Sequence, residues 1–149
     1  MTDTTSAPAT ATGRAAGETI TVVAWRDPVV EAMPDATLTA TNDTLVFQLP
    51  VLGPTATLIA HRLAGYAALG EPRQFTMGDL ARTFGLANST ARVQASLRRL
   101  EDFDVVKING DVVAIRLALP PLAAHRRRQL PGYLAEEYRR RQLSFRRRA

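Results

Sequence analysis

The sequence predicts an α+β fold that is mostly α-helical. Between residues 54 and 101, apolar side chains recur at helical spacing in three successive segments. Residues 105–117 then change to two β-branched runs on either side of an Asn-Gly pair, which is typical of a hairpin. Additional helices are expected near both ends of the chain. A length of 149 residues suffices for one domain with its own core and terminal extensions.

Two segments precede this helical region. Residues 1–18 are rich in Thr, Ala and Ser, and they are predicted to form a disordered tail. Residues 19–53 are expected to form an extension that packs on the core. Within it we expect a strand or first ordered contact at 20–25, a helical turn at 29–33 and a short extended segment at 44–49.

Two helices are expected before the Arg-rich one. Pro54 suits the first position of a helix, which should span 55–69 before Gly70. A second helix over 76–84 has Thr76 as its cap, with the hydroxyl placed to accept from the Asp79 backbone N–H. Gly85 then ends this helix, because glycine readily adopts the left-handed conformation.

The segment 88–101 predicts a third helix with two different faces. Its apolar stripe consists of Val93, Leu97 and Leu100. The opposite side mixes small residues with Arg and Gln: Ala91, Arg92, Gln94, Ala95, Arg98 and Arg99. Such a surface can approach the DNA major groove closely and still donate hydrogen bonds to guanine and adenine.

A hairpin follows at 105–117. Its turn is predicted at Asn109-Gly110, with both residues at positive φ. The short run Gln74-Phe75 is expected to be a strand that pairs with this hairpin.

The order of helix, turn, Arg-rich helix and hairpin resembles the winged helix-turn-helix domain of bacterial transcriptional regulators. The resemblance rests on the 79–81 start, Gly85-Leu86, the 97–101 run ending near Phe103, and the Asn109-Gly110 turn. It implies a three-helix core with a small antiparallel β wing over 54–118. It also implies that double-stranded DNA is bound, with the third helix in the major groove and the hairpin as a wing. The implied contact residues are Ser89, Thr90, Arg92, Gln94, Arg98, Arg99, Lys107 and Arg116.

Charge supports a polyanionic partner. Residues 1–53 carry a net charge of −4, residues 54–118 carry +2, and residues 119–149 carry +7. The last segment is expected to be an Arg-rich helical extension. Its stripe of Leu130, Leu134 and Tyr138 could pack on the domain or on a second subunit, which would make a homodimer.

Other observations favour alternatives. Acidic residues at the end of the third helix and beside the turn repel phosphate: Glu101, Asp102, Asp104 and Asp111. A protein-interaction or dimerisation module that does not bind specific DNA is therefore the second hypothesis. Binding of RNA or DNA without sequence preference by the Arg-rich tail is the third.

Several function classes are disfavoured by what the sequence lacks. There is no Cys, and His61 and His125 have no carboxylate at helical spacing, so neither a metal site nor an enzyme is expected. No cofactor or small-molecule ligand is evident. No apolar run approaches the ~18 residues of a membrane span, and no signal peptide is apparent. With Arg strongly preferred over Lys, we expect a bacterial, cytoplasmic, nucleoid-associated protein.

Overall fold

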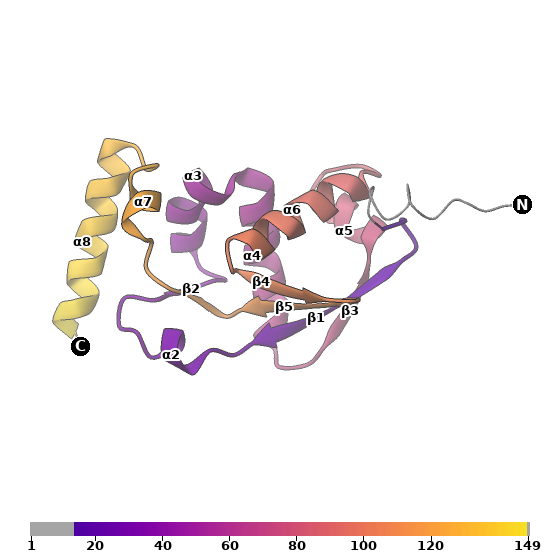
Figure 1. Cartoon of the computed structure of the whole chain (residues 1–149), viewed down its shortest axis with the longest axis horizontal. Helices are drawn as coiled ribbons and strands as arrows, with labels where there is room; N and C mark the ends of the chain where they lie inside the picture. Colours follow the sequence, from indigo (N-terminus) through magenta and orange to yellow (C-terminus); the bar gives the residue numbers. More distant parts are fainter. Residues whose placement is uncertain (1–13, 149) are drawn as a thin grey trace, which may run out of the picture.

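The chain folds as α+β, with helices packed on a small mixed sheet (Figure 1). The structure is a computed structural model that describes residues 14–148. Its elements, in chain order, are β1 (Thr19–Trp25), α2 (Pro28–Glu31), β2 (Thr37–Leu38), the π-helical turn η1 (Thr44–Gln48), α3 (Leu49–Leu52), α4 (Pro54–Ala67), β3 (Arg73–Thr76), α5 (Met77–Thr83), α6 (Thr90–Asp102), β4 (Val106–Asn109), β5 (Val112–Arg116), β6 (Ala118–Leu119), α7 (Ala124–Arg127) and α8 (Gly132–Arg148).

The main sheet has the strand order β3-β1-β5-β4. Strand β1 runs parallel to β5 and antiparallel to β3, and β4 and β5 form an antiparallel hairpin. The prediction that residues 74–75 pair with the hairpin is therefore wrong. Strand β1 lies between them because its alternating residues Ile20 and Val22 are buried and its backbone bonds to a strand on each side.

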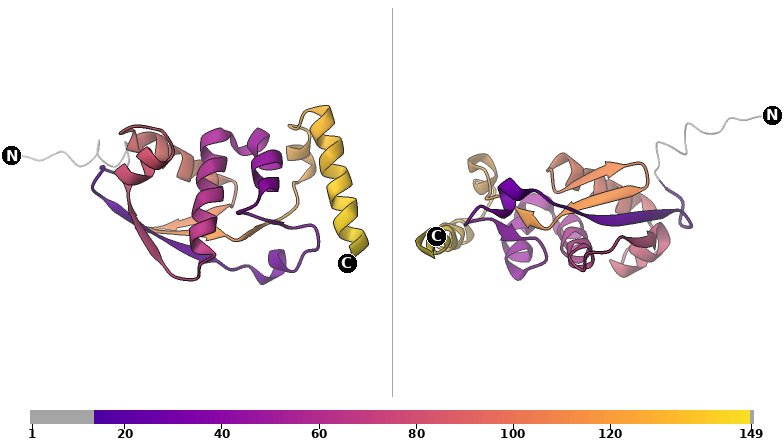
Figure 2. Two further views of the ribbon diagram at one scale, coloured as in Figure 1. Left: turned by 180° about the vertical axis from the view of Figure 1, so that it is seen from behind. Right: turned by 90° about the horizontal axis from the view of Figure 1, so that it is seen from below.

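Helices α4 and α6 cover one side of this sheet, and α5 closes the core at the end away from α8 (Figures 1 and 2). The core joins side chains from the sheet and from all three helices. The following members are at most 1% exposed: Ile20, Val22, Leu52, Ile59, Leu63, Met77, Leu80, Val93, Leu97, Leu100 and Ile115. The three predicted helices are thus present, with ends within two residues of the expected ones.

The turn between α5 and α6 forms as its residues predict. The Thr76 hydroxyl accepts from the Asp79 N–H at 3.0 Å. After α5, Gly85 has a φ of 71°, and the Leu86 N–H donates to the Ala81 carbonyl at 2.8 Å. This pattern is the Schellman motif, which satisfies carbonyls left unpaired at a helix end.

The hairpin turn differs by one residue from the prediction. Asn109 pairs with Val112, so the loop consists of Gly110 and Asp111. Gly110 has a φ of 61°, and Asn109 is not among the residues with positive φ. Glycine at the first central position is typical of a type II′ turn, which matches the strand twist as well as the expected type I′ turn.

The segment 44–49 is helical, so the prediction of an extended segment is wrong. The π-helical turn η1 leads directly into α3. Its loose alternation of apolar and polar residues is overridden by a helical spacing of buried residues, Thr44, Phe47, Gln48 and Val51. Phe47 and Val51 both bury their side chains against the C-terminal part of the chain. An extended segment would move these two side chains apart.

That C-terminal part forms a second apolar cluster. Its buried members are Phe47, Val51, Leu122, Leu130, Leu134 and Tyr138. The Phe47 and Tyr138 rings meet edge-on at 5.1 Å, and the Tyr138 hydroxyl accepts from the Leu122 N–H at 2.7 Å. The predicted stripe on α8 therefore packs on the chain's own domain. None of the helices in residues 14–148 is long and apolar enough to cross a membrane.

Residues 14–18 connect α5 with the hairpin. Of the residues 1–18 predicted to be disordered, 1–13 lie outside the described residues, whereas 14–18 form a turn with defined contacts. The Gly78 N–H donates to the Ala16 carbonyl at 2.9 Å, and a Cβ at Gly78 would lie 3.2 Å from that oxygen. Arg14 forms an ion pair with Asp111 at 2.6 Å. The N-terminal segment thereby joins the start of α5 to the hairpin turn.

Candidate nucleic-acid interface

Helix α6 is held with its apolar stripe inward. Val93, Leu97 and Leu100 are at most 1% exposed and face α4 and α5. The Ser89 hydroxyl accepts from the Arg92 N–H at 3.4 Å and caps the helix. The burial of this stripe determines which residues of α6 face outward.

The outward face of α6 is exposed. Ala91, Arg92, Ala95 and Arg98 are all exposed, and Thr90 is half-buried. Within residues 14–148, the side chains of Arg92 and Arg98 have no hydrogen-bond or ion-pair partner. Their Cα atoms lie roughly 9 Å apart along the helix axis, at 1.5 Å per residue. Both guanidinium groups are thus available to an external anion.

Gln94 does not lie at the expected edge of this face. It is 9% exposed, and its side-chain Oε1 is buried without a hydrogen-bond partner in the described structure. One step of about 100° from the buried Val93 places Gln94 at the border of the apolar stripe, and there its side chain is covered by the protein. The amide that was expected to read adenine therefore does not lie on the exposed face.

Arg99 is tied to the backbone of α3. Its Nε donates to the Leu52 carbonyl at 2.6 Å, and its Nη2 donates to the Val51 carbonyl at 3.0 Å. These carbonyls end a helix and have no intrahelical partner. The guanidinium also lies 5.0 Å from the centre of the Phe103 ring. Arg99 therefore uses its guanidinium N–H groups to stabilise the junction of α3 and α6. The same N–H groups would be needed to contact DNA.

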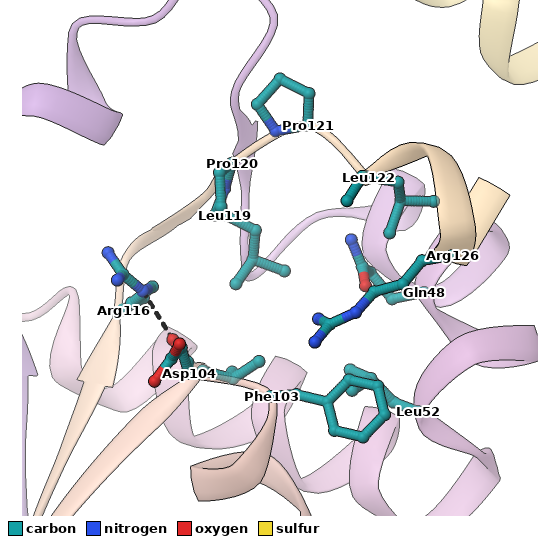
Figure 3. Close-up of a pocket in the computed structure, with 12 residues that line it drawn as sticks. Gln48, Leu52, Phe103, Asp104, Arg116, Leu119, Pro120, Pro121, Leu122 and Arg126 are labelled. Atoms are coloured by element: carbon teal, nitrogen blue, oxygen red, sulfur yellow. Dashed lines mark hydrogen bonds between the residues drawn. The ribbon is translucent and has the colours of Figure 1, made fainter.

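Arg116 is likewise held inside the protein. Its Nε donates to the Asp104 carbonyl at 2.6 Å (Figure 3). Its Nη1 lies 2.7 Å from the Asp27 carboxylate, and the side chain is 12% exposed. This hydrogen bond holds the pKa of Asp27 below its ordinary value.

Trp25 contacts both basic residues of the hairpin. Arg116 lies 3.8 Å from the centre of the indole ring, and the Lys107 Nζ lies 4.2 Å from it. Trp25 and Arg116 are partners in the β1–β5 register. Lys107 remains exposed, so it is the member of this pair that can still approach a phosphate.

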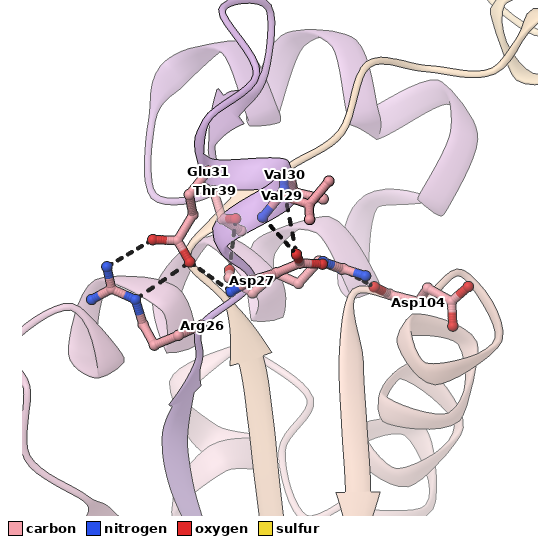
Figure 4. Close-up of polar contacts among 8 residues, drawn as sticks. Arg26, Asp27, Val29, Val30, Glu31, Thr39 and Asp104 are labelled. Carbon is pink, nitrogen blue, oxygen red and sulfur yellow. Dashed lines mark hydrogen bonds and ion pairs between the residues drawn. The ribbon is translucent and has the colours of Figure 1, made fainter.

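A polar network secures the chain beyond β1. The Glu31 carboxylate accepts from the Asp27 N–H at 2.7 Å and from Arg26 Nη2 at 2.7 Å (Figure 4). These bonds lower the pKa of Glu31, the backbone bond contributing most. The network fixes Asp27 in front of Arg116.

Two of the four acids near the interface have structural partners. Glu101 accepts from the Ile108 N–H at 3.1 Å, which joins α6 to β4. Asp111 is neutralised by Arg14. Asp104 contributes its carbonyl to Arg116 and occupies a left-handed backbone position with a φ of 58°.

The arginines of α8 are partly paired. Arg139 lies 2.7 Å from Glu136 and lowers the pKa of that carboxyl to about 2. Arg141 lies 2.6 Å from Asp43. The basic C-terminal segment is thus less available to a polyanion than its net charge suggests.

Six of the eight candidate residues fall into two groups, and Gln94 and Arg99 belong to neither. Arg92 and Arg98 are exposed on α6, with Ser89 at its N-cap and Thr90 at its first position, while Lys107 and Arg116 meet at Trp25. Sequence reasoning missed Trp25 as the centre of that second group. The sequence shows only a single Trp at the end of a predicted strand. It does not show that β5, with Arg116, is the neighbouring strand. Comparisons with protein-family models, with curated proteins and with solved structures give no match.

Proposed function

We propose that this protein binds double-stranded DNA and regulates transcription, using residues 54–118 as a winged helix-turn-helix. Helix α6 enters the major groove, and the β4–β5 hairpin is the wing. The observation that carries the proposal is the free outer face of α6, with Arg92 and Arg98 unpaired among the described residues. The resemblance in the order of elements supports the same function.

The composition of this face suits a groove. Ala91 and Ala95 add little bulk, so the helix backbone can approach base edges. Arg92 and Arg98 can each donate two parallel hydrogen bonds to guanine. The major groove is about 12 Å wide and admits one α-helix. Base contacts in helix-turn-helix proteins come mainly from the first turns of the second helix, where this basic face begins.

Three of the four acids that argued against DNA binding, Glu101, Asp102 and Asp104, lie at the end of α6 away from Arg92. Glu101 follows Arg92 by nine residues, which is roughly 13 Å along the axis. Its carboxylate is already bonded to the Ile108 N–H. Repulsion of phosphate is therefore weakest at the start of α6, around Arg92.

Fewer residues belong to the proposed interface than the sequence indicated. Ser89, Thr90, Arg92, Arg98 and Lys107 stay in it. The other three support the fold through the burial and bonds described above: Gln94, Arg99 and Arg116.

Fluorescence anisotropy with a pool of randomised duplexes at low salt, followed by selection of the bound sequences, tests the proposal. We expect Arg92→Ala and Arg98→Ala each to weaken binding to the selected duplex by about 1–3 kcal/mol, at a defined base step. Arg26→Ala removes the same charge near α2, away from α5 and α6 (Figure 1), and should bind like the unmodified protein.

Two results would overturn DNA binding through α6. One is no bound duplex at low salt. The other is unchanged affinity in both α6 variants, each shown by circular dichroism to be folded. If the Arg-rich tail binds without preference, its substitutions should weaken all duplexes equally and reduce the salt slope by about 0.9 for each phosphate that the tail no longer neutralises.

Dimerisation through α8 remains a prediction, but the apolar stripe expected to form the dimer contact packs within the protein itself. Leu130, Leu134 and Tyr138 are buried against the protein's own η1 and α3. A dimer would need other residues. Light scattering at several concentrations would measure the oligomeric state directly.

A further inference from the structure

A cavity of about 210 Å³ lies where the end of α6, the chain leaving β5, η1 and α7 meet (Figure 3). We propose that this cavity binds a small monocarboxylate that has an apolar body. The residues that carry the proposal are Gln48, Leu52, Phe103, Leu122 and Arg126. Binding here is independent of DNA binding, since the cavity does not include the outer face of α6.

Arg126 supplies the positive charge. In Figure 3 its guanidinium extends from α7 into the cavity, above the ring of Phe103. It lies 4.3 Å from the ring centre, and within residues 14–148 it has no acidic partner. The neighbouring Arg127 instead donates to the Leu122 carbonyl. A guanidinium held by an aromatic ring keeps its planar edge free for a carboxylate, which it can bind through two hydrogen bonds.

Gln48 supplies a second polar group. It is 9% exposed, and within the described residues its side-chain amide has no hydrogen-bond partner. Figure 3 shows this amide facing the cavity on the same side as Arg126. Because this amide has no partner among the described residues, its N–H groups can donate to the carboxylate that Arg126 holds.

The remaining wall selects an apolar body. Leu52, Leu119, Leu122 and the ring of Phe103 line the space with carbon. At about 30 Å³ per water, the volume corresponds to roughly seven waters, or a ligand of about seven to ten non-hydrogen atoms. Benzoate is a probe of this size and chemistry.

The cations that line the cavity favour a single carboxylate. Arg116 also lines the cavity, but Asp27 already neutralises it at 2.7 Å. Asp104 contributes its carbonyl to Arg116, and its carboxylate makes no ion pair among the described residues. Among the residues described, Arg126 is thus the cation of the cavity without an acidic partner, and the Asp104 carboxylate is the anion without a basic one.

Titration of benzoate into the full-length chain, followed by calorimetry and by NMR of the backbone amides, tests the proposal. We expect saturable one-to-one binding, with shifts at Phe103 and Leu122. Arg126→Gln should weaken binding by about tenfold or more, because it removes a charge-assisted pair. Arg128→Gln, an exposed arginine one residue beyond α7, is the matched control and should bind normally.

Two further probes separate the parts of the site. Benzyl alcohol has the same apolar body without the charge, and acetate has the charge without the body. Each should bind at least about tenfold more weakly than benzoate, since each lacks one of the two contacts. If Arg126→Gln fails to fold, Gln48→Leu should weaken benzoate binding while preserving side-chain volume.

The proposal is overturned if millimolar benzoate gives no saturable signal, which would show that water alone occupies the cavity. It is also overturned if folded Arg126→Gln binds as the unmodified protein does, or if acetate binds as tightly as benzoate. All of these measurements omit DNA, so their failure would not affect the proposed function.

Discussion

Asp104 adopts a backbone conformation that most residues avoid. Together with Ala87 it is one of two non-glycine residues in 14–148 with positive φ. It follows α6 as Gly85 follows α5, and the Val105 N–H donates to the Leu100 carbonyl at 2.9 Å. Its carboxylate also lies at the negative end of the helix dipole. Asp104 therefore lowers the stability of the folded protein at this position, and glycine would remove that loss.

We expect Asp104→Gly to stabilise the protein by about 1 kcal/mol, because glycine tolerates positive φ and removes the unfavourable charge. Its carbonyl would still accept from Arg116. Urea denaturation would measure the change. Asp104→Ala removes the same charge but keeps a Cβ, so a similar gain in that variant would contradict the backbone explanation.

At the scale of the element, α6 has two faces with different tasks. One face is packed into the core, and the other makes few contacts with the protein. Substitutions on the two faces should separate stability from DNA binding.

Leu97→Ala should lower the free energy of unfolding by about 2–5 kcal/mol, because the side chain is buried and its removal leaves a cavity. Arg98→Ala, the next residue along the helix, should change it by no more than about 0.5 kcal/mol. Chemical denaturation of both variants checks this. Equal losses of stability would show that α6 does not turn Leu97 inward and Arg98 outward.

Helix α8 depends on one buried hydrogen bond as well as on apolar contacts. Tyr138→Phe should destabilise the protein by about 1–3 kcal/mol, because the Leu122 N–H would be left buried without an acceptor. Tyr133→Phe is the matched control, since Tyr133 is 70% exposed. Hydrogen exchange at Leu122 would report the missing bond directly, and unchanged protection there would contradict the role assigned to Tyr138.

At the scale of the whole molecule, the N-terminal extension belongs to the core. Strand β1 occupies the interior of the sheet, and the Asp27–Arg116 ion pair joins residues far apart in sequence. Arg14 adds a second link to the hairpin through Asp111. Removing this extension would expose the sheet between β3 and β5.

The Asp27–Arg116 pair should make stability depend on acid pH. The pKa of Asp27 is lower in the folded protein than its ordinary value of 3.8, because Arg116 bonds to the charged carboxylate. The ionised Asp27 carboxylate therefore contributes to the stability of the folded protein above about pH 3.8. This contribution is lost as the pH falls through the pKa of Asp27 in the folded protein. Asp27→Asn should be less stable at pH 6 and should lose less stability between pH 5 and about pH 3. Urea midpoints across that range measure the effect, and an unchanged pH dependence would contradict it.

Glu136 provides a contrast to this pair. Its pKa of about 2 arises from Arg139 on the same exposed helix face. Solvent screens this exposed pair, and both residues belong to the same helix. Glu136→Gln should therefore alter the urea midpoint much less than Asp27→Asn does at pH 6.

The sequence by itself determined the local structure of this protein. The Thr76 cap, the Gly85 helix end and the spacing of Val93, Leu97 and Leu100 each act within a few residues. Their physical causes are backbone sterics, capping and amphipathic period, which can be read without knowing the fold. The same local reasoning was wrong at 44–49, where a loose alternation of apolar and polar residues hid a helical spacing of buried residues.

Only the tertiary structure decided which strands pair and which arginines stay free. The position of β1 between β3 and β5 depends on contacts between residues far apart in the chain. Arg99 and Arg116 look like Arg92 and Arg98 in sequence, but backbone carbonyls and Asp27 bind the first two. A side chain's availability depends on what the fold brings beside it, and no local pattern contains that information.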